Sequence, residues 1–235
     1  MAPLLQAQGL RAAYGRAEIL HGLDFAIAPG ELLVLLGRNG AGKSTTMKAL
    51  IGLLPPRGSI CFGGEEIAGR APHAIARMGL GYVPEERRIF TSLSVAENLQ
   101  VGRQPPRPGL APWTEEKLFA LFPNLAAMRG RTGGQMSGGE QQMLTIARTL
   151  MGNPRLLLLD EPSEGLAPVI VEQLAQAIAA LKQAGVAILL AEQNFHFARS
   201  IADRALIMES GSLRWEGGMT ALAEDEALRI RYLAL

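Results

Sequence analysis

Residues 37–45 read Gly37-Arg38-Asn39-Gly40-Ala41-Gly42-Lys43-Ser44-Thr45. This stretch has the complete spacing of a phosphate-binding loop. Its glycines allow backbone N–H groups to point inward around phosphates, and a helix that follows directs its positive N-terminal end at the anion. We expect Lys43 to reach the β- and γ-phosphates and the Ser44 hydroxyl to bind magnesium. The stretch therefore predicts a site for a nucleoside triphosphate and Mg²⁺.

The sequence on either side of this loop supports the prediction. An apolar run over residues 31–36 is typical of a buried central strand. Residues 44–54 suit a helix that the two prolines at 55 and 56 end. A strand that leads into a glycine-rich loop and then a helix is the context that a phosphate loop requires.

Alternating strand and helix patterns along the rest of the chain predict an α/β fold with a mainly parallel sheet. An antiparallel β subdomain is expected at the N-terminus, and a helical insert subdomain at about 86–150 interrupts the parallel part. The capping-box pattern at Ser94 opens a helix in this insert, and the four prolines of residues 104–112 indicate a surface loop. We expect residues 1–235 to form one domain. The predicted strands cover 4–10, 23–27, 31–36, 59–62, 80–83, 155–160, 186–191 and 204–208, and the predicted helices 44–54, 72–78, 114–122, 139–151, 169–184 and 224–235.

Two carboxylates follow a second apolar run. Residues 156–159 are four leucines, and Asp160 and Glu161 come directly after them. A buried strand that delivers Asp160 beside Ser44 places a carboxylate at the magnesium. Glu161 would then orient or deprotonate the attacking water. An apolar strand that ends in two carboxylates is weak evidence for a hydrolysis site when it occurs alone. It becomes strong evidence when a phosphate loop is present in the same chain.

A second glycine-rich helix start lies at Ser137, Gly138, Gly139 and Glu140. Its N–H groups can also grip a phosphate. Because the first loop already surrounds one triphosphate, the second is best used on the nucleotide of another subunit. The pair of motifs predicts a head-to-tail dimer with a nucleotide at the joint.

Composition restricts the remaining choices. Basic and acidic residues are balanced at 23 and 22, so no basic patch indicates nucleic acid as a partner. The single cysteine, Cys61, cannot form a disulfide within the chain and is expected as a small apolar core side chain. No apolar run approaches the roughly 20 residues of a membrane helix. No signal peptide pattern is present at the N-terminus, so we expect a cytoplasmic setting.

Together these motifs resemble the ATP-binding cassette (ABC) ATPase family over roughly residues 4–233. More narrowly, the chain resembles the ATPase subunits of branched-chain amino-acid importers. That narrower resemblance rests on residues 82–90 (Tyr-Val-Pro-Glu-Glu-Arg-Arg-Ile-Phe), 160–168 (Asp-Glu-Pro-Ser-Glu-Gly-Leu-Ala-Pro) and 191–194 (Ala-Glu-Gln-Asn).

The resemblance implies further roles. Tyr14 would stack on adenine. Glu85 stands where most of the family has a glutamine that links magnesium, the attacking water and the membrane partner. Gln193 stands where most of the family has a histidine that contacts the γ-phosphate. The candidate catalytic residues are thus Glu161, Gln193 and Glu85, and the candidate magnesium ligands Ser44, Asp160 and Glu85.

The departures from the family pattern have chemical consequences. Glu85 adds negative charge near the phosphates, and Gln193 can donate a hydrogen bond but cannot carry a proton as histidine does. Ala167 replaces an aspartate that signals across the dimer joint, and Met136 replaces a leucine before the signature. Similar substitutions occur in the importer subgroup. His196 lies near the histidine position, but the register favours Gln193.

The resemblance implies an enzyme that hydrolyses Mg-ATP to energise transport. Its expected partners are a second ABC ATPase subunit, either a copy or a sister chain, transmembrane permeases and, indirectly, a substrate-binding protein. Residues 85–90 and the helical insert would dock the permeases at the inner face of the membrane, with Arg87 and Arg88 as rim contacts. Alternatives are a urea or amide importer, a lipid exporter and, less favoured, a DNA-repair or translation ATPase.

Overall fold

The computed structural model describes residues 2–107 and 110–233 and centres on a six-stranded sheet. The strand order is β10-β9-β3-β8-β7-β6. All neighbouring pairs are parallel except β9 and β10, which form an antiparallel hairpin. The bounds are β3 Leu32–Leu36, β6 Leu80–Val83, β7 Leu156–Asp160, β8 Ala187–Glu192, β9 Arg204–Glu209 and β10 Ser212–Gly218. This is the mainly parallel α/β core that the sequence predicted.

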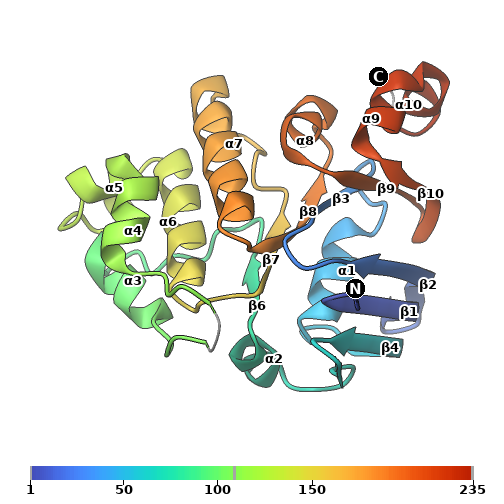
Figure 1. The fold of residues 1–235 in the computed structure, drawn as a ribbon, viewed down its shortest axis with the longest axis horizontal. Coiled ribbons are helices and arrows are strands. Elements are labelled where there is room, and N and C mark those ends of the chain that lie inside the picture. The colour runs from blue at the N-terminus through green and yellow to red at the C-terminus, as the bar shows by residue number, and fades with distance from the viewer. Residues whose placement is uncertain (1, 108–109, 234–235) are drawn as a thin grey trace.

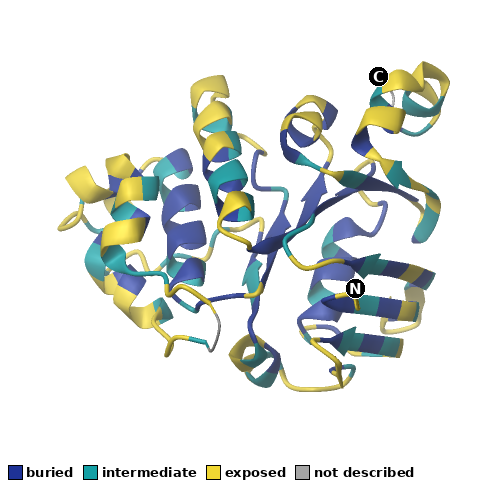
Figure 2. Ribbon diagram, viewed as in Figure 1, coloured by how far each residue is buried: buried dark blue, intermediate teal, exposed yellow. Residues whose placement is uncertain are grey.

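Side chains from both faces of this sheet enter hydrophobic cores, which explains why its central strands are apolar throughout. Every residue of β3, β7 and β8 is buried. Along β3, Leu33 and Leu35 pack toward helix α1 (Lys43–Leu50), which lies between the two sheets (Figure 1). Alternate residues of β3 pack instead toward α7 (Pro168–Gln183) and α8 (Phe195–Ile201) on the other face. Figure 2 shows the sheet buried between these layers.

The N-terminal strands form a separate antiparallel sheet of order β2-β1-β4-β5. Its bounds are β1 Leu5–Tyr14, β2 Ala17–Ile27, β4 Pro56–Phe62 and β5 Glu65–Glu66. Cys61 is only half-buried here, which corrects its placement in the core. Successive side chains of a strand point to opposite faces, and in β4 it is Ile60 and Phe62 that face the core.

Four α-helices of the described residues lie between β6 and β7 and gather beside the parallel sheet (Figure 1). They are α3 Val95–Gly102, α4 Glu115–Leu121, α5 Pro123–Ala127 and α6 Gly138–Leu150, with a 3₁₀ turn at Gly133–Gln135 before α6. Ser94 caps α3 by a capping box, as the sequence predicted. Helix α5, which begins at Pro123, was not predicted.

Some element bounds differ from the prediction for local reasons. Helix α1 ends at Leu50 and not at residue 54, because the chain turns at Gly52, whose φ of +76° suits glycine. The closing helix predicted at 224–235 is α10 Glu226–Leu233, and its last two predicted residues lie outside the described chain. Helix α9 Met219–Glu224, which precedes it, was not predicted. Helix α2 (Pro72–Met78) has the predicted bounds. None of the described helices is both long and apolar enough to cross a bilayer.

Candidate nucleotide and hydrolysis site

The predicted phosphate loop connects β3 to α1. Gly42 immediately precedes the helix with a φ of +109°, a conformation that side chains rarely adopt. The loop also lies tight against β9, because a Cβ on Gly37 would approach the Met208 carbonyl oxygen to 2.5 Å. Gly42 therefore allows the backbone conformation of the loop, and Gly37 allows its close packing against β9.

Lys43 is the first residue of α1, and its side chain is almost fully buried. The ammonium nitrogen donates to the carbonyl oxygens of Gly37 at 2.8 Å and Arg38 at 3.1 Å. It also lies 3.0 Å from Oε1 of Glu161. These three partners use all three donors of the ammonium group. Triphosphate binding through Lys43 must therefore displace some of these contacts.

Ser44 and Asp160 meet as predicted. The Ser44 hydroxyl donates to Oδ1 of Asp160 at 2.8 Å, and the Tyr82 hydroxyl donates to Oδ2 at 3.1 Å. Burial raises the pKa of Asp160, although the two hydrogen bonds act in the opposite direction. Burial, together with the charge of Asp160, raises the pKa of Tyr82 as well.

This oxygen pair fits magnesium. Mg²⁺ usually takes one or two protein oxygens and completes its shell with water and substrate phosphates. Ser44 and Asp160 supply a hydroxyl and a carboxylate at one point beside the phosphate loop. Within the described chain, no cluster of three or more His, Cys, Asp or Glu that could hold a metal ion is present.

A cavity of about 280 Å³ joins Tyr14 to the phosphate loop. Tyr14 ends β1, and 49% of its surface is exposed. The cavity also reaches Glu161, so the proposed adenine, phosphate and water residues share one space. Arg38 and Asn39 of the loop are exposed and do not line it. Its lining residues are Tyr14, Ile19, Gly40, Gly42, Lys43, Ser44, Thr45 and Glu161.

A second, polar cavity of about 170 Å³ is also lined by Glu161. Glu85, Arg87, Gln142, Glu161 and Glu164 line it. Glu85 and Glu161, predicted from distant segments, are therefore brought together. Gln142 and Glu164 were missed, and so was Tyr82. Arg87 lines this cavity as well, and its expected role as a permease contact stays a prediction.

The turn after β7 sets the position of Glu161. Its φ is +46°, and the Glu164 N–H donates to its carbonyl oxygen at 3.2 Å. This turn brings the two carboxyl groups within hydrogen-bonding reach, and their contact raises the pKa of Glu164. The signal in the sequence that could have indicated Glu164 is its position three residues after Glu161.

Glu192 links two loops of the site. Its carboxylate, 2% exposed at the end of β8, accepts from the Ser163 N–H at 3.1 Å and from the Asn194 N–H at 3.3 Å. Burial raises its pKa, while both hydrogen bonds act in the opposite direction. The loop that carries Glu161 and the loop that carries Gln193 thus share one anchor.

Gln193 follows β8 directly and is exposed. Because β8 lies between β3 and β7, Gln193 emerges between the phosphate loop and Asp160. His196 is also exposed but lies within α8, with its ring centroid 6.0 Å from that of Phe195. Gln193 thus lies directly after the end of β8, whereas His196 is the second residue of α8.

The signature opens α6 with a complete capping box. Ser137 Oγ accepts from the Glu140 N–H, and the Glu140 carboxylate accepts from the Ser137 N–H at 2.7 Å. Gly139 is buried, and a Cβ there would come within 2.8 Å of Ile170. Residues 137–140 do not line the described cavity of Lys43.

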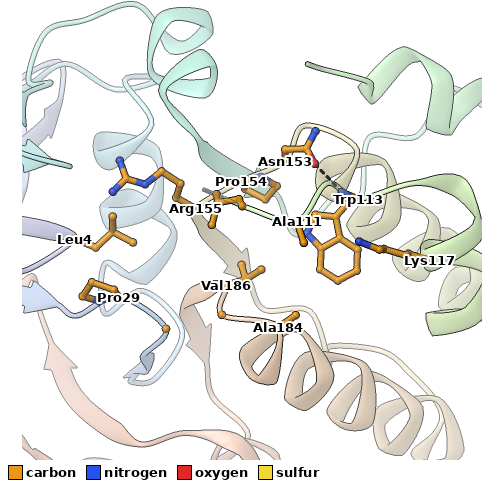
Figure 3. Close-up of a pocket in the computed structure, with 13 residues that line it drawn as sticks. Leu4, Pro29, Ala111, Trp113, Lys117, Asn153, Pro154, Arg155, Ala184 and Val186 are labelled. Carbon is orange, nitrogen blue, oxygen red and sulfur yellow. Dashed lines mark hydrogen bonds between the residues drawn. The ribbon is translucent and has the colours of Figure 1, made fainter. Parts of the chain in front are cut away.

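Another cavity, of about 330 Å³ and mainly apolar, lies where residues 110–117 meet the core (Figure 3). The Asn153 side chain accepts from the Trp113 N–H at 2.8 Å and donates to the Gln104 carbonyl at 3.0 Å. No residue of the phosphate loop lines it. This cavity is part of the junction between the insert and the core.

Comparison with known proteins decides the family. A family model described as ABC transporter matches residues 20–164. The chain is 42% identical to the high-affinity branched-chain amino acid transport ATP-binding protein BraG of Pseudomonas aeruginosa, over 94% of this chain and 95% of BraG. The chain belongs to the ABC transporter ATPase family. It is also 34% identical to the lipopolysaccharide export system ATP-binding protein LptB of Escherichia coli K12, over 97% and 96% of the two chains.

Solved structures agree on the fold. An ATP-binding subunit of an ABC transporter superposes with a TM-score of 0.81 at 28% identity, covering 98% of this chain and 96% of that chain. An ATP-binding cassette in its ADP conformation gives 0.82 at 24% identity over 98% and 99% of the two chains. As an ABC ATPase, the protein binds and hydrolyses ATP. Cassettes of this family work as dimers with transmembrane permease components.

Proposed function

We propose that this ABC ATPase energises import of branched-chain or related amino acids through separate permeases. The 42% identity to BraG over nearly the whole chain supports this cargo class. The subgroup residues at 82–90, 160–168 and 191–194 support it as well. Identity to LptB at 34% keeps lipid export as the second candidate. Uptake of radiolabelled leucine by vesicles that contain the cognate permeases tests import, and vesicles without this chain are the control.

The contacts of Lys43, Ser44 and Asp160 are the observation that carries the proposed chemistry. Lys43 binds the β- and γ-phosphates, and Ser44 and Asp160, with Glu85 nearby, hold magnesium, which neutralises phosphate charge. Glu161 accepts the proton of the attacking water or orients it. Gln193 donates a hydrogen bond to the γ-phosphate, and Tyr14 stacks on adenine.

The second half of each site comes from a partner ATPase. In our proposal, Ser137, Gly138 and Gly139 bind the γ-phosphate of the partner's nucleotide, and Glu140 acts through the capping box that holds this helix start. Residues 1–235 act as one ATPase domain, in which residues 86–150 are the helical subdomain. The partner is a copy or a sister chain.

A groove of about 610 Å³ supports the docking of a permease. It runs between α2 and the helical insert, and Arg88 lies in its wall. Three large apolar side chains of this groove, Leu53, Phe90 and Val101, are 46–53% exposed. A permease segment with apolar residues would cover them and hold the ATPase at the inner, cytoplasmic face of the membrane. A substrate-binding protein would then act on the permeases from the far side.

Glu161→Gln tests the proposed hydrolysis site. Because a positioned base contributes typically 10²–10⁴-fold, we expect ATP turnover to fall by about this factor. Fluorescent ATP analogue binding should persist, and the variant should accumulate as an ATP-bound dimer in size-exclusion chromatography. Glu172→Gln, at an exposed position of α7, is the matched control. Unchanged turnover in Glu161→Gln would contradict the proposed role of Glu161 in activating water.

A further inference from the structure

Gln142 is buried beside the hydrolysis site with an unpaired amide. Its side chain belongs to α6, and only 2% of the residue is exposed. Its Nε2 has no hydrogen-bond partner among the described residues. A buried donor without a partner is destabilising, so such groups are normally satisfied by protein or ordered water. The amide therefore needs an acceptor.

The polar cavity that Gln142 lines offers such acceptors. The carboxyl groups of Glu161 and Glu164 bound it, held together by the turn after β7. Its volume of about 170 Å³ exceeds what a single water requires. A water there has an amide donor on one side and carboxylate acceptors on the other, which meets the need for two to four polar partners.

We propose that Gln142 is a positioning residue for ATP hydrolysis, whose amide holds the Glu161–Glu164 carboxyl pair through water in this cavity. The proposal rests on the function proposed for Glu161. Gln142 does not touch the nucleotide. It acts on the orientation of the carboxylate that faces the attacking water.

The ion pair of Lys43 explains why Glu161 needs this support. The Glu161 carboxylate lies 3.0 Å from the Lys43 ammonium. When phosphate oxygens engage Lys43, Glu161 loses that contact. The bonds from Gln142 and Glu164 then remain to fix its orientation. Gln142 also lies in the first two turns of α6, whose N-terminus is the signature, so it couples the partner-facing helix start to Glu161.

Gln142→Met tests the proposal because methionine has a similar length and volume and donates no hydrogen bond. Loss of one such bond in the transition state corresponds to about tenfold in kcat. We expect this fall with the KM for ATP within about twofold, because nucleotide contacts are untouched. The thermal midpoint should change little, because methionine fills the same buried space. Gln183 is an exposed residue of α7, so Gln183→Met controls for the effect of replacing a glutamine by methionine away from the site.

A double mutant separates positioning from general damage. Glu164→Ala changes an exposed residue and should also lower kcat about tenfold. Since both residues act through one carboxyl pair, Gln142→Met/Glu164→Ala should be little worse than either single variant. Wild-type kcat in either single variant, a raised KM, or multiplied losses in the double variant would overturn the proposal. If Glu161→Gln abolishes turnover while Gln142→Met does not change it, the positioning role fails and the proposed hydrolysis site stands.

Discussion

Lys43 is buried at the start of α1 and bonds to two carbonyl oxygens and to Glu161. Lys43→Ala removes the cation that the triphosphate needs. Since hydrogen bonds to charged groups contribute about 1.5–3 kcal/mol each, two lost phosphate contacts should weaken ATP binding by about 100-fold or more. Equilibrium binding of a fluorescent ATP analogue measures the change. Lys48→Ala, in the last turn of the same helix, should bind within about twofold of wild type.

Gln193 and His196 are the two candidates for the γ-phosphate contact, and one pair of variants distinguishes them. Gln193→Ala should lower kcat about tenfold, because it removes one hydrogen bond at the end of β8. His196→Ala should leave kcat unchanged, because this exposed side chain lies against Phe195 within α8. Steady-state ATPase rates under saturating Mg-ATP measure both. The reverse result would assign the contact to His196.

Residues of the site that lie in one short segment could be predicted from the sequence. The phosphate loop is such a segment, and so is Asp160 with Glu161. Tyr82, Gln142 and Glu192 could not be predicted, because their roles depend on contacts across the fold. Tyr82 meets Asp160 only because β6 pairs with β7, and Gln142 meets Glu161 only because α6 packs beside that strand end.

At the scale of elements, the two capping boxes allow a matched comparison. Ser94 caps α3 and Ser137 caps α6 by the same pair of bonds. Replacing either serine by alanine should lower the free energy of unfolding by about 1 kcal/mol and the thermal midpoint by about 2–4 °C. Ser137→Ala should in addition lower ATP turnover, because its hydroxyl faces the partner's nucleotide in our proposal. Equal ATP turnover in Ser94→Ala and Ser137→Ala would show that Ser137 caps its helix and has no further role in hydrolysis.

Long helices and elements that proline or glycine delimit were predicted well, whereas the long strands β1 and β2 were predicted too short and several short helices were missed. Helix α2 and strand β6 have the predicted bounds because proline and glycine delimit them. Helices α5 and α8 have five and seven residues, too few for a clear apolar period, and their ends depend on packing against neighbours. The half-burial of Cys61 follows from β-sheet alternation, which a four-residue strand prediction did not use.

At the scale of the whole molecule, our proposal assigns the phosphate loop and the signature of one chain to different sites. In a dimer of this chain, a mixture of Lys43→Ala and Ser137→Ala should turn over more ATP than either variant alone. Random pairing makes half of the dimers mixed, and each mixed dimer has one intact site of two, so about a quarter of wild-type turnover is expected. ATPase assays of the pure and mixed variants measure this. Absence of rescue in mixtures that form dimers would contradict a shared site.

The carboxylate of Glu192 holds the backbone on both sides of the catalytic edge, at Ser163 and at Asn194. Two loops with independent anchors could adopt four combinations of open and closed positions. Loops that share one buried anchor move together, which leaves two. In our proposal, Glu161 and Gln193 would therefore approach the phosphate, or leave it, as a pair, and a half-assembled site would not form.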